Sequence, residues 1–197
     1  MVDQVAEETL ASPPPGGWGA RRVVIVVAAL VGLASVAAGV WWLTHPTWFS
    51  DFGAEEGVVS TPGRPVWVGV TFPDVSAPPI TVHLDSVAPH VVSDTSGATV
   101  TSFVCTNRPF TGPGITVLGS GGTAMMRDSC AHLARARDVD MTVGRGHPEY
   151  LLLKMVPAHL GHLRIDRVGL TYGKGLQHGT QSIRFALTMQ AHPPLGR

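Results

Sequence analysis

Histidine and methionine side chains provide the candidates for metal chemistry in this sequence. The imidazoles of His159 and His162 are three residues apart, and methionines such as Met155 and Met189 carry soft thioethers that suit Cu(I). Residues three apart on a strand point to opposite faces, so the histidine pair converges only across a turn. Both methionines also fall in phase with apolar neighbours, which is typical of core positions. Copper or another metal is therefore the alternative function, with His159 and His162 as its candidate ligands.

A second pattern places oxygen ligands at calcium-loop spacing. Asp138, Asp140, Thr142 and Glu149 match positions 1, 3, 5 and 12 of an EF-hand loop. Position 6 of that loop requires glycine for a sharp turn, and this chain has Val143 there. The flanking sequence also alternates as strands do and lacks the paired helices of an EF-hand. The pattern therefore does not predict a calcium site.

Catalytic patterns are equally incomplete. The run 119–122 reads Gly-Ser-Gly-Gly, which lacks the Gly-x-Ser-x-Gly spacing of a hydrolase nucleophile. No glycine loop that would hold a phosphate opens a helix, and no carboxylate pair has the pattern of a glycosidase. We expect no enzyme activity, no catalytic residue and no cofactor. Fourteen acidic residues balance fourteen basic ones, so net charge gives no reason to expect nucleic-acid binding.

The chain has two cysteines, Cys105 and Cys130, which allow one intramolecular pairing. Both follow the apolar segment 23–43, and the outer side of a membrane is an oxidising compartment. Their disulfide would close a loop of about 26 residues, worth on the order of 3.5 kcal/mol in the chain-entropy model. The alternative, a catalytic thiol, needs a single reactive cysteine beside a base. We predict the disulfide.

The first element that positions these groups is an apolar helix at 23–43. These 21 residues carry no charge, and as a helix they span about 31 Å, close to the roughly 30 Å of a bilayer core. Arg21 and Arg22 precede the segment, and the next basic residue is Arg64. Because basic residues stay on the cytoplasmic side, we predict a single-pass cell-membrane anchor with its N-terminus inside. The remaining chain is then extracytoplasmic and contacts the bilayer through 23–43.

Two features of this segment leave alternatives open. The chain has small residues before a possible cleavage site after Ala38, as a signal peptide does, although the apolar run is longer than usual. Ala28, Gly32, Ser35 and Gly39 place small residues on one helix face, which suits self-association. The same spacing also arises by chance in a segment rich in alanine and glycine.

Composition divides the rest of the chain into a tail, a linker and one domain. Residues 1–22 are proline-containing and aperiodic, which predicts a short disordered cytoplasmic tail. The acidic stretch 44–62 is typical of a linker. About 130 residues remain in the unit 63–192, enough for one hydrophobic core. A short tail, 193–197, follows it.

The domain 63–192 reads as strands. Apolar residues alternate with polar ones in segments such as 80–84 and 183–189, and turn residues separate the segments. Seven to eight such strands predict an all-β fold, a two-sheet antiparallel sandwich preceded by the transmembrane helix. The apolar phase shifts by one residue near Asp166–Arg167, which predicts a β-bulge there. Residues 123–137 form the one helix candidate in the domain.

One run in this domain carries a resemblance. Residues 157–172, from Pro157 through His159, Gly161 and Leu170 to Tyr172, resemble the closing strands of bacterial immunoglobulin-like domains. Together with the anchor, the chain is similar to single-pass envelope proteins of high-GC bacteria that carry an immunoglobulin-like extracytoplasmic domain. The resemblance implies an immunoglobulin-like sandwich at the cell membrane. It implies no activity, so no catalytic residue is carried over.

These observations predict a non-catalytic interaction module, or an accessory subunit of a membrane complex, that binds a protein or an envelope component. Specific contacts would come from loops or from a sheet edge, and two loops carry exposed residue types among turn residues: 107–111 and the nine-residue 173–181. The alternative for Phe110 is packing in the core under the disulfide. The candidate binding residues are Arg108, Phe110, Lys174, Gln177 and His178.

Overall fold

A computed structural model describes residues 18–45, 47–49, 54–70, 78–108, 122–144 and 149–194. They belong to two compact units, Met1–Trp41 and Trp42–Arg197. Helix α1 (Trp18–Thr44) contains the predicted apolar helix 23–43 and begins five residues earlier, so 18–22 are helical where we expected a disordered tail. The rest of that tail lies outside the described residues.

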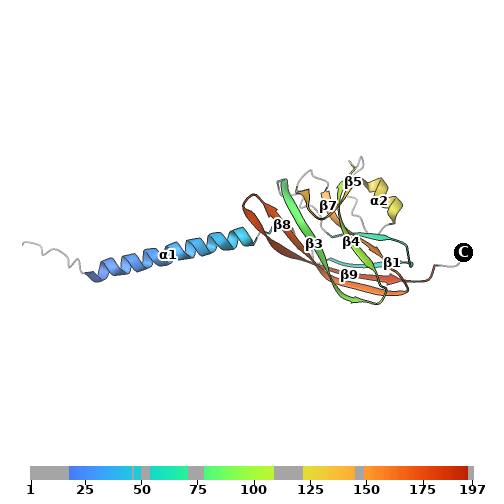
Figure 1. Cartoon of the computed structure of the whole chain (residues 1–197), viewed down its shortest axis with the longest axis horizontal. Helices are drawn as coiled ribbons and strands as arrows, with labels where there is room; N and C mark the ends of the chain where they lie inside the picture. The colour runs from blue at the N-terminus through green and yellow to red at the C-terminus, as the bar shows by residue number, and fades with distance from the viewer. Residues whose placement is uncertain are drawn as a thin grey trace, which may run out of the picture. The chain divides into compact units, whose positions relative to one another are not determined.

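The second unit is a two-sheet β-sandwich (Figure 1). One sheet has five strands in the order β1-β9-β8-β3-β6, and the other has four in the order β2-β7-β4-β5. The predicted two-sheet sandwich behind one apolar helix is confirmed, with nine strands among the described residues. The elements are β1 (Ala54–Ser60), β2 (Val66–Gly69), β3 (Ile80–Asp94), β4 (Thr99–Asn107), α2 (Thr123–Ser129), β5 (Cys130–Arg135), β6 (Val139–Val143), β7 (Glu149–Val156), β8 (Gly161–Lys174) and β9 (Gln177–Ala191).

Alternating residues from both sheets fill the core between them. Leu84, Ile165 and Phe185 come from the five-stranded sheet, and Val68 and Leu151 come from the four-stranded one; each is at most 1% exposed. Burial of every second residue is what the sequence alternation predicts for an antiparallel sheet with one solvated face. The outer face of the five-stranded sheet is therefore available to polar residues.

A second, smaller apolar cluster covers the outer face of the four-stranded sheet. It contains the predicted disulfide, which the structure confirms between Cys105 on β4 and Cys130 at the start of β5, with a Cα–Cα distance of 5.5 Å. Met126 of α2 packs onto Trp67 and Leu152 beside it. The helix expected at 123–137 ends at Ser129, because the chain turns into β5 to pair with β4.

The prediction of a linker at 44–62 is wrong for residues 54–60, which form strand β1. Residues 54–60 form a strand that pairs in parallel with the end of β9, from Ala54 opposite Phe185 to Ser60 opposite Ala191. Val58 is buried and the adjacent Val59 is 68% exposed. The segment holds two glutamates and a glycine, so its apolar alternation is too short to indicate a strand from sequence. The other strand pairs are antiparallel.

The bulge predicted near Asp166–Arg167 is confirmed. The pairing of β8 with β9 shifts register between Ile165 and Arg167, and this shift keeps apolar residues facing the core on both sides of it. The prediction of a nine-residue loop at 173–181 is wrong. Strand β8 continues to Lys174 and β9 begins at Gln177, so Gly175 and Leu176 alone form the turn. Gly175 has φ +58°, as a two-residue hairpin with glycine first requires.

Candidate functional site

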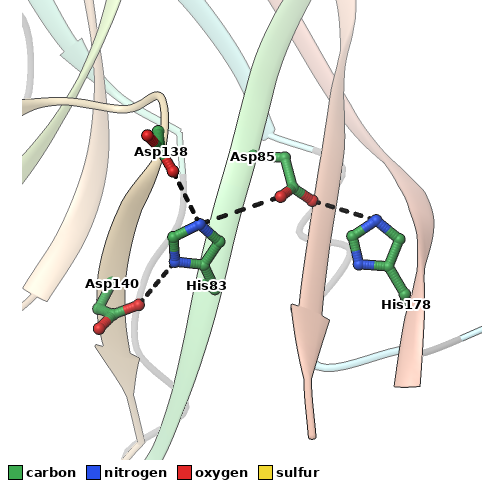
Figure 2. Close-up of polar contacts among 5 residues, drawn as sticks. All are labelled: His83, Asp85, Asp138, Asp140 and His178. Atoms are coloured by element: carbon green, nitrogen blue, oxygen red, sulfur yellow. Dashed lines mark hydrogen bonds and ion pairs between the residues drawn. The ribbon is translucent and has the colours of Figure 1, made fainter. Parts of the chain in front are cut away.

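Two histidines and three aspartates form a row across the outer face of the five-stranded sheet. Figure 2 shows the members of this histidine–aspartate row: His83, Asp85, Asp138, Asp140 and His178. Strand register builds it, because Asp140 on β6 pairs with His83 on β3, which lies opposite Gly173 on β8, and Gly173 lies opposite His178 on β9. The row therefore depends on four strands that are distant in sequence.

His83 lies at the centre of the row, with a carboxylate at each ring nitrogen. Its Nδ1 is 2.8 Å from Asp140 Oδ1, and its Nε2 is 3.1 Å from Asp138 Oδ1 and 4.0 Å from Asp85 Oδ1 (Figure 2). A carboxylate accepts hydrogen bonds only, so satisfying both sides requires an N–H on each nitrogen, which is the imidazolium form. The hydrogen bond that His83 donates to Asp140 is the main cause that raises the pKa of His83 above 6.5, and Asp138 adds to it.

Asp138 reaches His83 from the corner between the two sheets. The chain leaves β5, an edge strand of one sheet, and enters β6, an edge strand of the other, through residues 136–138. Asp138 has φ +54°, a left-handed conformation that aspartate tolerates better than most residues. The ion pairs from Asp138 and Asp140 to His83 thus fasten this corner and the edge strand β6 to β3.

The other half of the row joins β9 to β3 across β8. His178 Nε2 lies 3.4 Å from Asp85 Oδ2, at ion-pair distance, and Asp85 stands where β3 shifts register against β8. Gly173 makes this possible, since a Cβ there would come within 2.7 Å of His178 Nδ1. Glycine at position 173 therefore leaves room for the His178 imidazole in this position.

His83 can bind and release a proton in this row, because its side chain is 46% exposed and lies between carboxylates. Within the described part of the chain, no group of three or more His, Cys, Asp or Glu residues is arranged to hold a metal ion. The geometry is that of a pH-dependent clamp on the corner rather than of a metal centre.

Raising the pH should loosen this clamp. Because the pKa of His83 is raised on folding, its stabilising contribution is fully present below pH 6.5 and is lost as the pH rises through the folded-state value. We expect the melting temperature of the native chain to fall between about pH 5 and about pH 8 by more than that of His83→Gln. NMR titration of the His83 imidazole should give a pKa above 6.5, and Asp140→Asn should lower it.

The matched control is His132→Gln, which replaces an exposed histidine on β5 that lies outside the row. It should retain the full pH dependence of the native chain. If His83→Gln and His132→Gln follow the same pH profile as the native chain, His83 does not hold the corner through its charge.

The candidate binding residues of the second loop fall on the β8–β9 hairpin. Lys174 is exposed, with its Nζ 4.8 Å from the centre of the Trp48 ring. His178 is exposed and belongs to the histidine–aspartate row. Gln177 was expected to be exposed and is instead 7% exposed, with its Nε2 donating a 3.3 Å hydrogen bond to the Trp42 carbonyl oxygen.

The chain next to this hairpin is fastened by an aromatic and amide network. The backbone N–H of Trp48 donates to the Tyr172 hydroxyl at 3.1 Å, and the backbone N–H of Phe49 donates to Gln181 Oε1 at 3.2 Å. The Tyr172 hydroxyl in turn donates to Gln181 Oε1 at 2.6 Å. The rings of Phe49 and Tyr172 meet edge to face, 5.0 Å apart. Residues 48–49 are therefore part of the domain rather than of a linker.

The remaining candidate residues are not brought together. Arg108 is exposed, with its backbone N–H bound to the Ser129 carbonyl oxygen at 2.9 Å, and Phe110 lies outside the described residues. His159 Nδ1 lies 3.2 Å from the Leu160 carbonyl oxygen, whereas His162 Nδ1 lies 2.9 Å from Thr95 Oγ1. The two histidines of the metal alternative thus have separate partners.

The oxygen residues at calcium-loop spacing serve the sheets instead. Asp138 and Asp140 face His83, while the Glu149 carboxylate accepts from the Thr142 N–H and the Thr106 hydroxyl. They lie on β6, β7 and the corner before β6, so they do not surround one point.

On the small-residue face of α1, the side chain of Ser35 makes a hydrogen bond within the helix. The Ser35 hydroxyl donates to the Val31 carbonyl oxygen one turn earlier, at 2.9 Å. A Cβ added at Gly32 or Gly39 would meet nothing within 4 Å, so the helix surface there is open. Self-association through Ala28, Gly32, Ser35 and Gly39 stays a prediction.

Sequence reasoning missed His83 and Asp85 as candidate site residues. Both lie on a strand where polar residues alternate with apolar ones, which indicates only an exposed face. Their partners on other strands are 55 to 93 positions away, and pairing them requires the register of β3 with β6 and β8. One local signal was available, the His-x-Asp spacing that places both side chains on the same face of a strand.

Comparison with known proteins does not identify a family for this chain. No family model and no curated protein matches the chain. Among solved structures, it is similar to the ASH / PapD-like domain of human CEP192 (PapD-like domain 7), at 11% identity and TM-score 0.32, over 72% of this chain and 84% of that one. A family 123 glycoside hydrolase from Clostridium perfringens matches at 8% identity and TM-score 0.26, over 72% of this chain and 23% of that one. At these TM-scores neither similarity assigns a fold or an activity.

Proposed function

We propose that this chain is a membrane-anchored extracytoplasmic domain that binds a protein or an envelope component, alone or as an accessory subunit of a membrane complex, without catalytic chemistry. The observation that carries the proposal is the helix Arg22–Thr44, with mean hydropathy 2.7 and the length to cross a bilayer, followed by a β-sandwich. A signal sequence near an N-terminus has the same properties, so the experiment must separate the two.

Charge and redox chemistry support the orientation that we propose. Arg21 and Arg22 precede the apolar run, and the next basic residue is Arg64, so the positive charge favours a cytoplasmic N-terminus. The disulfide between Cys105 and Cys130 persists in an oxidising compartment, as the outer side of the membrane is. Both arguments support a sandwich on the outer side of the membrane.

The binding surface is expected on exposed polar residues that core packing does not explain. Arg108, at the end of β4, and His178, on the hairpin side of the sandwich, are exposed and lie on different sheets. Placing a photo-crosslinking amino acid at each position, in native membranes, should capture a partner at one of them. The same label at Leu160 is the control, and equal capture at all three positions would contradict a specific surface.

A reporter fused after Arg197 should be active outside the cytoplasm. Replacing both Arg21 and Arg22 with Glu should reduce that activity, because it removes the positive charge that holds the N-terminus inside. Arg64→Glu, which changes an arginine beyond the apolar run, should leave it unchanged. The intact mass of the membrane protein distinguishes an anchor from a cleaved signal sequence. Cytoplasmic reporter activity, or loss of the residues before position 39, would contradict the proposed anchor.

A further inference from the structure

The tip of the β8–β9 hairpin exposes an apolar side chain. Leu176 is 89% exposed, more than any other large hydrophobic residue that the structure describes. Gly175, at φ +58°, adopts the backbone conformation that the turn requires. The turn itself therefore does not require a leucine at position 176. A leucine in full contact with water gains free energy when it is transferred to an apolar environment.

The residue after this leucine is held against Trp42, the first residue of the second compact unit. Gln177 is buried, and its Nε2 donates to the carbonyl oxygen of Trp42, which belongs to the same compact unit. Trp42 is one residue before the end of the segment 23–43 that we propose to span the membrane. Consecutive Cα atoms are 3.8 Å apart, so Leu176 lies within about one residue of that contact.

A second contact holds the chain at the same end of β8. Trp48 donates its N–H to the Tyr172 hydroxyl, and Lys174 places its ammonium 4.8 Å from the centre of the Trp48 ring. The chain therefore contacts the hairpin at Trp42 and again at Trp48. Tryptophan and lysine are the residue types that occupy the boundary between hydrocarbon and headgroups.

We propose that the β8–β9 hairpin tip is a lipid-contacting element that enters the bilayer interface beside the end of the anchor. Leu176 inserts at the boundary of headgroups and acyl chains, while Lys174 stays at the level of anionic headgroups. The inference rests on the membrane anchoring proposed above, and it assigns the lipid surface as the partner of this hairpin. The domain would then be held close to the membrane rather than suspended on a flexible tether.

The experiment places an environment-sensitive fluorophore at the tip of the full-length chain. The two native cysteines are joined in the disulfide, so Leu176→Cys adds a single free thiol for labelling. The chain is reconstituted into phosphatidylcholine vesicles with and without phosphatidylglycerol, some carrying a spin label on the lipid acyl chain. We expect the emission to shift to shorter wavelength and the lipid spin label to quench it, more strongly when phosphatidylglycerol is present.

Leu160→Cys is the matched control. Leu160 is also an exposed leucine, 52% exposed, and it precedes the first residue of β8, whereas Leu176 follows the last. Fourteen strand residues separate the two positions by roughly 40 Å. The label at position 160 should keep the emission that it has in water and should escape lipid quenching.

The outcomes separate this inference from the anchor itself. If the labelled chain floats with the vesicles but positions 176 and 160 are quenched equally, the anchor stands and the hairpin does not contact lipid. A shift to shorter wavelength without lipid quenching places Leu176 against the chain's own apolar residues and also overturns the inference. A chain that fails to float with the vesicles overturns the anchor, and the hairpin contact with it.

Discussion

Cys130→Ala should lower the free energy of unfolding of the sandwich by about 2–5 kcal/mol. The disulfide joins β4 to the start of β5 and closes the loop that contains α2, so its loss frees this loop in the unfolded chain. The folded state loses packing as well, because both sulfurs lie in the cluster under α2 with Trp67 and Leu152. Denaturant unfolding of the purified chain measures the change.

Reduction of the native chain provides the control for this prediction. It removes the same bond without changing a residue, so it should reproduce most of the loss seen for Cys130→Ala. Denatured protein should show no free thiol before reduction. Two titratable thiols in that material, or equal stability of the oxidised and reduced chains, would show that the bond does not stabilise the fold.

Tyr172→Ala should cost about 3–5 kcal/mol, as truncation of a buried aromatic residue does. Tyr172 is fully buried and meets the Phe49 ring edge to face at 5.0 Å, so alanine leaves a cavity where residues 48–49 reach the domain. Thermal or denaturant unfolding monitored by tryptophan fluorescence should report the loss, since the backbone N–H of Trp48 donates a hydrogen bond to the Tyr172 hydroxyl.

A pair of tyrosine variants separates the hydroxyl from the ring. Tyr172→Phe should cost about 1–3 kcal/mol, because it leaves the Trp48 N–H and Gln181 without the hydroxyl that joins them. The Tyr150 hydroxyl is also buried, which raises the pKa of Tyr150 to about 12, yet it has no hydrogen-bond partner among the described residues. Tyr150→Phe should therefore be close to neutral. Equal losses in the two variants would contradict a specific role for the Tyr172 hydroxyl.

Sequence patterns predicted the features of this fold that depend on neighbours along the chain. Alternation within 80–84 and 183–189 indicated which residues face the core. The phase shift at Asp166–Arg167 located a bulge to the residue, because a strand cannot otherwise move its apolar residues to the other face. The disulfide followed from two cysteines having a single pairing.

Features that depend on strand register were not predictable in the same way. Strand β1 carries two glutamates and is stabilised by its pairing with β9, which its own residues do not indicate. Leu152 and Met126 form a second cluster because α2 covers the outer face of β7. The histidine–aspartate row requires β6, β3, β8 and β9 to align. The sequence favours a long loop over a tight hairpin here, because the polar residues that begin β9 resemble turn residues.

Because β1 pairs in parallel with β9, the five-stranded sheet must form in a fixed order during translation. Ala54 is made early, but its partner Phe185 lies close to the end of the chain. At roughly 5–20 residues per second, the ribosome supplies that partner on the order of ten seconds later. Strand β9 also provides one whole side of β8, so the five-stranded sheet cannot close before β9 has been made. This sheet must therefore remain incomplete until then, and a chain cut short before β9 leaves two strands without their neighbour.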